Sequence, residues 1–587
     1  MITRTKIICT IGPAVQTLEK MMELIRAGMN VARLNFSHGT HEEHQEAIDL
    51  LKEARKRMGT PLAIMIDTKG PEIRLGMVEG EGVRLEQGDK WLLVKESLVG
   101  NRERVSINPG HVLEKIPVGS SVLFDNGYVS SKVISNGPEG VLVEISNGGI
   151  VKSKKGVNIP YVNLDLPAVT EKDIEDIRFG CRNDVEIIAA SFVRSSDHVL
   201  TIKNLLVEEK KNDILVIAKI ENNEGVQNFD SIVQVADGIM IARGDLGVEV
   251  PLSQVPKLQK MMIRKSYLAG KPSVTATQML ESMIQSPRPT RAEASDVANA
   301  IYDSTSSVML SGETAVGKYP IETVQVMASI AREAESDFDY RVFFNLHAPL
   351  VYHDVPSAVT LATVKTAYSS NAQAIFAFTQ GGSTARLLSR LRPRMPIIAM
   401  TSIEKIYHQL AFNWGVVPFL GKECTNITEA FGQVSAFALE QQLVSYGDLV
   451  VVTAGSPFGI SGTTNTMIVE SIGDVLVRGF TGWGQRVHGN VALVLSPESR
   501  PTYTVRDQIV TIAKCDSSYL PLIRESQGVI LQNHINDVES EQYAMRVARE
   551  LGKSVIVRAD AACRILKEGQ LITLDPEKSL VYKGVVF

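Results

Sequence analysis

The chain has 587 residues, of which 44% are hydrophobic and 22% charged, a composition typical of a folded, soluble protein of about four domains. A net charge of −5 argues against a general nucleic-acid-binding protein, and the absence of about 18 consecutive apolar residues argues against a membrane protein. Five scattered cysteines, and an N-terminus without the apolar segment of a signal peptide, favour a cytoplasmic protein that has neither disulfides nor a structural zinc.

The first part of the chain alternates apolar runs with amphipathic stretches, a pattern that predicts parallel strands joined by helices. Helix starts are expected at Thr170 and at Thr290, where Glu293 completes a capping box. Eight such units predict a (β/α)₈ barrel. A doubly wound sheet is the alternative, but the polar residues of interest follow at least six different strands, which favours a closed ring. The eight predicted strands lie within 5–13, 30–39, 61–74, 185–193, 214–222, 238–247, 271–278 and 307–314.

Three further regions accompany the barrel, which we expect over 1–71 and 158–345. Residues 72–157 are rich in Gly and Val, carry turn signals and lack helical periodicity, so they predict an inserted all-β domain. Residues 346–477 alternate apolar runs with helical stretches and predict a second α/β domain. Residues 483–587 predict a small appended α/β module.

A lysine and two carboxylates stand where two of the apolar runs stop. ILVIAKIEN (214–222) presents Lys219 and Glu221, and GIMIARGDLG (238–247) presents Arg243 and Asp245. Active sites gather at the carboxyl ends of parallel strands. Two carboxylates there can hold a divalent cation, while a lysine supplies charge for a phosphate or enolate oxygen. The alternative is a set of salt-bridged strand ends.

Two earlier strands also end in polar residues. ARLNFSHG (32–39) carries Arg33, Asn35, Ser37 and His38, and IDTKGPEIR (66–74) carries Asp67, Thr68 and Arg74. The side-chain oxygens of these strand ends can cage a weakly hydrated monovalent cation, and the arginines can bind phosphate bidentately. The alternative is turn chemistry with an Asp–Arg ion pair. The oxygen donors of the predicted cage are Asn35, Ser37, Asp67 and Thr68.

The last two barrel strands end in hydroxyl and acidic residues. Thr277 follows the seventh strand, and Ser311 and Glu313 follow the eighth. A threonine in this position can also be a simple helix cap. The sequence has no P-loop and no protein-kinase motif set, so the two commonest phosphoryl-transfer scaffolds are excluded.

A second phosphate-binding pattern lies in the later α/β region. TQGGSTAR (379–386) follows an apolar strand and opens a helix, and its glycines, hydroxyls and free N–H groups suit a phosphate. GSPFGISGTTN (455–465) is the predicted facing loop. The alternative is an ordinary turn in which Ser383 or Thr384 caps the helix.

Eight segments of the chain resemble, nearly letter for letter, the signature segments of pyruvate kinase. They follow in the same order between about residues 4 and 475: CTIGP, ARLNFSHG, DTKGPEIR, SKKGVNIP, AKIENNEG, ARGDLGVE, ATQMLESM and VMLSGETA. The resemblance implies transfer of the phosphoryl group of phosphoenolpyruvate to ADP, giving pyruvate and ATP, in the last step of glycolysis. It also implies that the inserted β domain is a lid over the barrel mouth and that residues 346–477 form a regulatory domain.

The resemblance assigns roles to the catalytic and metal-binding residues. Glu221 and Asp245 look like the ligands of Mg²⁺ or Mn²⁺. Lys219 and Arg33 look like the cations that face the phosphoryl group. Thr277, Ser311 and Glu313 are candidates for the path of the proton that completes pyruvate, in an order that the sequence leaves open. The predicted pocket for the phosphoenolpyruvate carboxylate is formed by Gly244, Asp245 and Thr277.

The nucleotide, potassium and effector sites are implied in the same way. The K⁺ ligands match Asn35, Ser37, Asp67 and Thr68, and Glu72 is the residue typical of potassium-requiring members. The effector, a phosphorylated sugar or a nucleotide, is expected in the 379–386 loop. The nucleotide contacts match Asn35, Phe36, Ser37, His38, Arg74 and Lys155, and the effector contacts match Thr379, Gly382, Ser383 and Thr384.

Two segments depart from the simplest family pattern. Residues 528–575 faintly resemble a swivelling phosphohistidine module, but Tyr543 stands where the phosphorylated histidine is expected. FDNG (124–127) has Asn126 where a second acidic residue is expected, which affects the predicted contact of the lid with the nucleotide.

The sequence thus predicts a cytoplasmic, allosteric pyruvate kinase that uses Mg²⁺ and K⁺ and binds neither nucleic acid nor a membrane. The family resemblance implies a homotetramer. Two alternatives are kept open: a related metal-enolate barrel enzyme, such as a lyase or a phosphoenolpyruvate synthase, and a catalytically silent regulator that binds metabolites.

Overall fold

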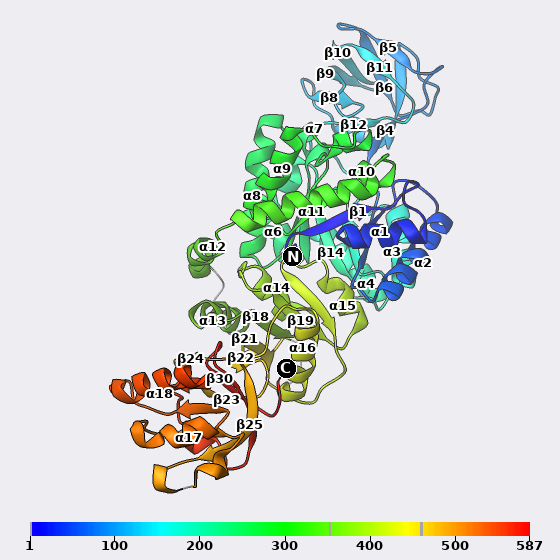
Figure 1. Cartoon of the computed structure of the whole chain (residues 1–587). Helices are drawn as coiled ribbons and strands as arrows, with labels where there is room; N and C mark the ends of the chain where they lie inside the picture. Colours follow the sequence, from blue (N-terminus) through cyan, green and yellow to red (C-terminus); the bar gives the residue numbers. More distant parts are fainter. Residues whose placement is uncertain (1–2, 351–353, 458–461, 500, 587) are drawn as a thin grey trace. The chain divides into compact units, whose positions relative to one another are not determined.

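A computed structural model describes residues 3–350, 354–457, 462–499 and 501–586. The chain divides into two compact units. The first consists of Met1–Val364, Ala377–Thr425 and Ala454–Thr466, and the second of Lys365–Phe376, Asn426–Thr453 and Met467–Phe587. The order of the elements can be followed by colour in Figure 1.

Eight parallel strands close into a barrel in the order β1-β17-β16-β15-β14-β13-β3-β2. The predicted (β/α)₈ fold class is therefore confirmed. Each barrel strand lies in one of the eight predicted runs, except that β2 begins one residue before its run. Their bounds are β1 Lys6–Thr10, β2 Met29–Asn35, β3 Ala63–Asp67, β13 Ile187–Ala190, β14 Leu215–Ile220, β15 Gly238–Ala242, β16 Ser273–Ala276 and β17 Ser307–Leu310.

Helices follow the barrel strands, and several begin with the capping side chains that the sequence predicts. The Thr170 and Thr290 hydroxyls accept hydrogen bonds from the backbone N–H groups of Asp173 and Glu293, whose carboxylates bond back to the capping residues. The helices are α1 Leu18–Ala27, α2 His41–Met58, α3 Glu171–Arg182, α4 Ser196–Glu208, α5 Asn223–Gln227, α6 Phe229–Val235, α7 Arg243–Glu249, α8 Val255–Leu268, α9 Arg291–Tyr302, α10 Gly312–Ala315 and α11 Pro320–Asp337.

The barrel interior is a packed apolar core. Inward-facing residues such as Ile8, Met65 and Met240 form one buried cluster. Phe412, which follows α15 (Glu404–Leu410) in the later α/β region, is fully buried in the same cluster. An aromatic ring from outside the barrel therefore completes its core.

The inserted region 72–157 is a separate β structure, as predicted. Seven strands close in the order β10-β6-β7-β4-β12-β8-β9, and β11 pairs with β5. Its core includes Trp91 and Phe124, whose rings meet edge to face with centroids 5.2 Å apart. The strands are β4 Ile73–Leu75, β5 Val83–Leu85, β6 Lys90–Val94, β7 Arg104–Asn108, β8 Ser121–Phe124, β9 Val129–Gly137, β10 Gly140–Asn147, β11 Gly149–Val151 and β12 Gly156–Asn158.

The next region contains a five-stranded sheet with the order β20-β19-β18-β21-β22, the second α/β domain that the alternating pattern predicts. Its strands are β18 Ala374–Phe378, β19 Ile397–Thr401, β20 Val416–Leu420, β21 Leu449–Gly455 and β22 Thr464–Ser471. The helices of this part of the chain are α12 Tyr340–His347, α13 Val355–Ser369, α14 Ser383–Ser389, α15 Glu404–Leu410 and α16 Ile427–Glu440.

The C-terminal region forms an eight-stranded sheet in the order β23-β30-β29-β25-β26-β27-β28-β24. Strands β25 to β28 run parallel to one another, and the outer strands are antiparallel. The elements are β23 Val475–Arg478, β24 Thr481–Trp483, β25 Val487–Leu493, β26 Ile509–Ile512, α17 Leu520–Glu525, β27 Gly528–Leu531, α18 Val538–Leu551, β28 Ser554–Val557, α19 Ala562–Ile565, β29 Leu571–Asp575 and β30 Leu580–Lys583.

Short 3₁₀ helices complete the described structure, at Gly110–Lys115, Leu252–Gln254, Glu281–Ile284, Ala348–Leu350, Pro497–Ser499, Thr502–Val505 and Ser517–Tyr519. None of the helices in the described residues is long and apolar enough to cross a membrane.

Candidate active site

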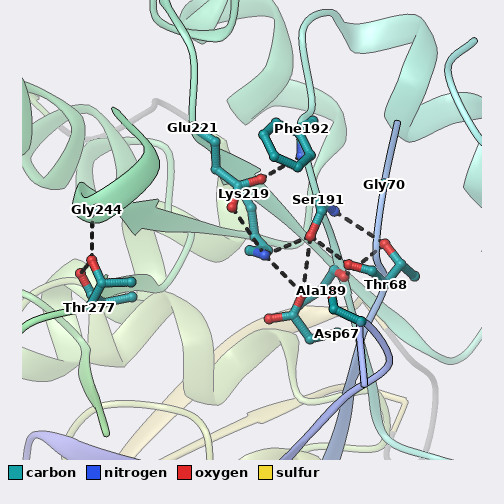
Figure 2. A network of polar contacts seen from close by, with 12 residues as sticks. Asp67, Thr68, Gly70, Ala189, Ser191, Phe192, Lys219, Glu221, Gly244 and Thr277 are labelled. Atoms are coloured by element: carbon teal, nitrogen blue, oxygen red, sulfur yellow. Dashed lines mark hydrogen bonds and ion pairs between the residues drawn. The ribbon is translucent and has the colours of Figure 1, made fainter. Parts of the chain in front are cut away.

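A buried network of charged and polar side chains lies at the carboxyl ends of β3, β13 and β14 (Figure 2). The Lys219 Nζ donates hydrogen bonds to Asp67 Oδ1 at 2.9 Å and to Ser191 Oγ at 2.6 Å. It also lies 3.1 Å from Glu221 Oε1. Because the strands are parallel and in register, residues distant in sequence meet at one end of the barrel.

Lys219 is a buried cation that two carboxylates stabilise. Only 8% of the residue is exposed. Burial by itself lowers the pKa of Lys219, but the nearby charges of Asp67 and Glu221 outweigh burial and hold the pKa above its ordinary value. The two carboxylates therefore favour the charged form of the ammonium group, as a site for an anionic group requires.

Asp67 binds a second cation, Arg33 of β2. Arg33 Nε donates to Asp67 Oδ2 at 2.6 Å, and Arg33 Nη1 donates to Thr10 Oγ1 at 2.9 Å. Burial opposes ionisation of Asp67, but Arg33 and Lys219 lower its pKa below the ordinary value. One carboxylate thus holds both predicted phosphoryl-facing cations in place.

Glu221 and Asp245 form a pair of buried carboxylates. Glu221 Oε2 accepts the backbone N–H of Phe192 at 2.5 Å, and Asp245, in the first turn of α7, is hydrogen-bonded to Glu221. Burial raises the pKa of Glu221, and Asp245 raises it further. Burial likewise raises the pKa of Asp245.

These two carboxylates fit a divalent cation. A positive ion between them would lower the free-energy cost of burying two negative charges and would offset their mutual repulsion. No group of three His, Cys, Asp or Glu side chains suited to a metal occurs in the part of the chain that the structure describes. The pair would therefore need further oxygen ligands from a substrate or from water, the arrangement typical of Mg²⁺ at phosphate sites.

Thr277 and Gly244 lie together beyond β15 and β16. The Gly244 N–H donates to Thr277 Oγ1 at 2.8 Å (Figure 2). Thr277 and Gln278 have positive φ angles of 68° and 53°, a left-handed conformation that costs free energy for residues with side chains. The backbone is thus held in an unusual turn where the substrate carboxylate is predicted to bind.

Arg243 fixes that turn and does not join the Lys219 network. Its Nη2 donates to the Thr277 carbonyl oxygen at 2.8 Å, and its Nη1 donates to Asp296 Oδ1 at 2.8 Å. The sequence places Arg243 beside Asp245 at a strand end. The structure shows that its contacts stabilise the loop of Thr277.

Glu313 and Ser311 lie at the end of β17. Glu313 is buried, and its carboxylate accepts the backbone N–H groups of Ser311 at 2.7 Å and Leu280 at 3.1 Å. Burial raises the pKa of Glu313. These contacts tie together the loops that follow β16 and β17.

The segment after β2 holds the predicted potassium and nucleotide contacts. Asn35 pairs with Asp67 in the β2–β3 register, and its Oδ1 accepts the Ser37 N–H at 3.1 Å. The Thr68 hydroxyl accepts the Ser191 N–H at 3.2 Å. The structure therefore brings the four predicted potassium ligands onto two neighbouring strand ends.

Phe36 and His38 have different environments. The Phe36 ring is buried and stacks on the His44 ring, with centroids 4.0 Å apart. The His38 side chain is exposed. Because the Phe36 ring is part of the core, any nucleotide contact of Phe36 would be made by its backbone.

A cavity of about 440 Å³ separates the inserted β domain from the barrel. Arg74, Lys155, Asp125, Glu72 and Asp245 are among its lining residues. Arg74 Nη2 lies 2.6 Å from Glu72 Oε2, and Lys155 Nζ lies 2.9 Å from Asp125 Oδ1. The cavity thus places two predicted nucleotide contacts next to a predicted metal ligand.

Sequence reasoning missed three residues of this site. Ser191 connects Lys219, Asp67 and the Thr68 carbonyl oxygen, which it reaches at 2.6 Å. Phe192 provides the N–H for Glu221, and Thr10 binds Arg33. Ser191 directly follows β13, so the strand-end rule that identified Lys219 also applies to it.

Comparison with known proteins identifies the family. A family model described as pyruvate kinase, barrel domain, matches residues 2–324, and one described as pyruvate kinase, alpha/beta domain, matches residues 357–470. The chain belongs to the pyruvate kinase family. Curated pyruvate kinases from Geobacillus stearothermophilus and Staphylococcus aureus (strain USA300) are each 41% identical to it over 584 residues, 99% of both chains.

A solved structure supports the same conclusion. The crystal structure of a pyruvate kinase from Cryptosporidium parvum matches with a TM-score of 0.77 at 38% identity, covering 80% of this chain and 96% of that chain. The chain is an enzyme that transfers the phosphoryl group of phosphoenolpyruvate to ADP, giving pyruvate and ATP. The resemblance seen in the sequence is confirmed, and neither the metal-enolate alternative nor the silent regulator is supported.

The C-terminal module is shared with the bacterial pyruvate kinases, which align over almost the whole chain. In this module Tyr543 packs against the apolar core, and the Arg546 guanidinium lies 5.3 Å from the centre of its ring. Nearby, Arg558 Nε donates to Glu541 Oε2 at 2.6 Å. The position where a phosphorylated histidine is expected in the related module is thus occupied by the packed phenol ring of Tyr543.

The predicted effector loop of this pyruvate kinase borders a cavity of about 260 Å³. Thr379, Ser383 and Thr384 line it, and Thr384 Oγ1 lies 2.6 Å from Thr464 Oγ1. Gly382 has a φ of 77°, which lets the chain turn tightly into α14. Within the predicted facing loop 455–465, residues 458–461 lie outside the described residues.

Proposed function

We propose that Lys219 and Arg33 hold the phosphoryl group of phosphoenolpyruvate during its transfer to ADP. The observation that carries this assignment is the buried network in which Asp67 orients both cations. A fixed cation in a site of low dielectric stabilises charge on the transferring group without reorganising. Ser191 holds the ammonium group of Lys219 from a second direction.

Glu221 and Asp245 are the proposed ligands of Mg²⁺ or Mn²⁺. Bound there, the ion would act as a Lewis acid toward substrate oxygens. The chain's own contribution is to keep the two carboxylates together, through the Phe192 N–H and the adjacent Lys219.

Asn35, Ser37, Asp67 and Thr68 are the proposed K⁺ ligands. All four carry side-chain oxygens, the donor type that weakly hydrated cations prefer, and Asn35 and Asp67 are partners in the register of β2 and β3. The Glu72 carboxylate, characteristic of potassium-requiring members, is present and paired with Arg74.

The substrate carboxylate is proposed to bind at Gly244, Asp245 and Thr277, where the α7 backbone begins and its N–H groups favour an anion. Thr277, Ser311 and Glu313 are proposed to carry the proton to the carbon of the enolate. Burial raises the pKa of Glu313, which is the direction that favours a carboxyl group able to hold a proton. ADP is proposed to contact Arg74, Lys155 and the 35–38 segment: Asn35, Phe36, Ser37 and His38.

We also propose the regulatory and cellular context: a cytoplasmic homotetramer whose activator is a phosphorylated sugar or nucleotide bound at Thr379, Gly382, Ser383 and Thr384. The lining of that cavity is rich in hydroxyls and includes Lys422. In the double variant Ser383→Ala/Thr384→Ala, the response to a panel of phosphorylated metabolites should be lost. An unchanged response, in an assay where Ser370→Ala behaves as wild type, would refute the effector assignment.

We propose four domains. The barrel covers 1–71 and 158–345, the inserted β domain 72–157, the regulatory α/β domain 346–477 and the appended module 483–587. For the C-terminal module we propose a structural or regulatory role, since Tyr543 lacks the imidazole nitrogen that a phosphohistidine carrier needs.

The proposed cation chemistry is tested by pyruvate formation from phosphoenolpyruvate and ADP. Titration of Mg²⁺, Mn²⁺ and K⁺ in turn, each with the others fixed, should show dependence on one divalent and one monovalent ion. Full turnover without K⁺ would contradict the monovalent site, and full turnover with a metal chelator present would contradict the carboxylate pair.

A further inference from the structure

The backbone of residues 36–38, which leads from β2 toward α2, is bonded through its N–H groups to the two neighbouring strands. The Phe36 N–H donates to a carbonyl oxygen of β3 at 2.9 Å. The Ser37 N–H donates to Asn35 Oδ1 at 3.1 Å, and the His38 N–H donates to the Asn35 carbonyl oxygen at 3.2 Å. These bonds fix the N–H groups of the segment but leave its carbonyl oxygens to find other partners.

Two of those carbonyl oxygens are bound by side chains from the starts of α2 and α3. His44 Nε2 donates to the His38 carbonyl oxygen at 2.9 Å, and Lys172 Nζ donates to the Phe36 carbonyl oxygen at 3.1 Å. Because a carbonyl oxygen can only accept, the proton of the His44 ring is assigned to Nε2. Two helices that follow different barrel strands thus hold one short segment.

His44 makes a second contact with the same segment. Its ring stacks on the buried Phe36 ring, with centroids 4.0 Å and planes 11° apart. Gly39, whose φ is 78°, turns the chain closely past the imidazole, and a Cβ at this position would lie only 3.3 Å from His44 Nε2. The stack and the hydrogen bond together restrict the imidazole to one orientation.

We propose that His44 and Lys172 are positioning residues for ADP, which act through the 35–38 segment. The inference rests on the proposed role of that segment as a nucleotide contact. A carbonyl oxygen carries partial negative charge and would repel the phosphates of ADP if it turned toward them. The bonds to His44 and Lys172 offset this charge on two oxygens and keep both directed at the helices. The ammonium group of Lys172 also adds positive charge beside the segment.

The first test measures KM for ADP and for phosphoenolpyruvate in the full-length enzyme at saturating K⁺, because Asn35 and Ser37 are also proposed K⁺ ligands. His44→Leu removes the donor and keeps an apolar side chain against Phe36. Its KM for ADP should rise about 3-fold to 10-fold, the effect of losing one hydrogen bond, while the KM for phosphoenolpyruvate should change little. His44→Gln keeps an N–H donor and should restore most of the loss.

Lys172→Met should raise the KM for ADP in the same selective way. Lys172 is exposed, so its replacement leaves the barrel core intact. Gln45→Leu and Lys52→Met are the matched controls. Gln45 Nε2 donates to Asn183 Oδ1 at 2.8 Å, and Lys52 Nζ donates to the Asn183 carbonyl oxygen at 2.7 Å. Asn183 caps the far end of α3. Both controls therefore lose a bond of α2 that does not reach the segment, and both should keep the wild-type KM for ADP.

Hydrogen exchange separates this inference from the assignment on which it rests. MgADP should slow the exchange of the backbone amides of the 35–38 segment in the wild-type enzyme. No slowing would contradict the nucleotide role of the segment, and the inference would fall with it. Slowing in wild type, combined with a wild-type KM for ADP in both His44→Leu and Lys172→Met, would overturn the inference alone. Equal rises in the two KM values, or rises as large in the control variants, would also overturn it.

Discussion

Arg33 and Lys219 bind the two oxygens of the same carboxylate. Asp67 Oδ2 accepts from Arg33 Nε at 2.6 Å, and Asp67 Oδ1 accepts from Lys219 Nζ at 2.9 Å. The two cations come from β2 and β14, and the carboxylate comes from β3. The spacing of the positive charges that face the phosphoryl group is therefore set by one acidic side chain.

Asp67→Asn should abolish turnover and lower stability. The substitution leaves two buried cations without their shared anion, and breaking such an arrangement costs about 3–5 kcal/mol. Asp89→Asn is the matched control, because Asp89 pairs with Arg102 at the lid surface, where solvent screens the two charges. Urea unfolding and a coupled assay measure both effects. Equal losses of stability in the two variants would contradict the shared-anion role.

Ser191→Ala should lower kcat by about 10-fold to 100-fold, because the hydroxyl removed holds a charged donor, a bond worth about 1.5–3 kcal/mol. The KM for ADP should change little, since Ser191 contacts Lys219 and Asp67. Ser131→Ala removes another buried hydroxyl, from the lid, where its partner is the Val122 carbonyl oxygen, and should keep wild-type kcat. A normal kcat in Ser191→Ala would show that the Ser191 hydroxyl does not contribute to catalysis.

Acid should destabilise the first compact unit through His408. Its Nδ1 accepts the Leu62 N–H at 3.2 Å, and burial lowers its pKa from 6.5 to about 3. Between these values the unfolded chain binds a proton that the folded chain does not. The free energy of unfolding therefore falls as pH drops below 6.5, by up to about 1.4 kcal/mol per pH unit.

His408→Asn retains an acceptor for Leu62 and removes the titrating ring, so its urea midpoint should fall less steeply with pH than that of wild type. Some slope should persist, because burial also lowers the pKa of His198, to about 4. Parallel pH profiles for the variant and wild type would show that His408 does not titrate in this way.

Much of the fold could be predicted because the apolar runs and helix caps seen in the sequence agree with the tertiary structure. Each barrel strand is an apolar run that the tertiary structure buries, and the Thr170 and Thr290 caps lie at the helix starts that their spacing predicts. The strand-end rule also located Lys219, Asp67 and Arg33, because parallel strands deliver their last residues to one end of the barrel.

Other features depend on contacts that no local pattern contains. The role of Arg243 as a tie for the Thr277 loop requires Asp296, which lies 53 residues away. Phe412 looks like an ordinary apolar residue, yet it completes the core of a barrel to which its segment does not belong. The hydrogen bond from the Phe192 backbone N–H to Glu221 could not be predicted either, because the residue type gives no indication of it.

The most direct test of the central claim is pyruvate formation by Lys219→Met in a coupled assay. Asp67 keeps Arg33 as a partner, and the raised pKa of Glu221 lets that carboxyl become neutral, so the variant should fold with a Tm close to that of wild type. Phosphoryl transfer should fall by at least about 1,000-fold, the scale on which charged groups stabilise such transition states. Near-normal turnover by a folded Lys219→Met enzyme would contradict the account.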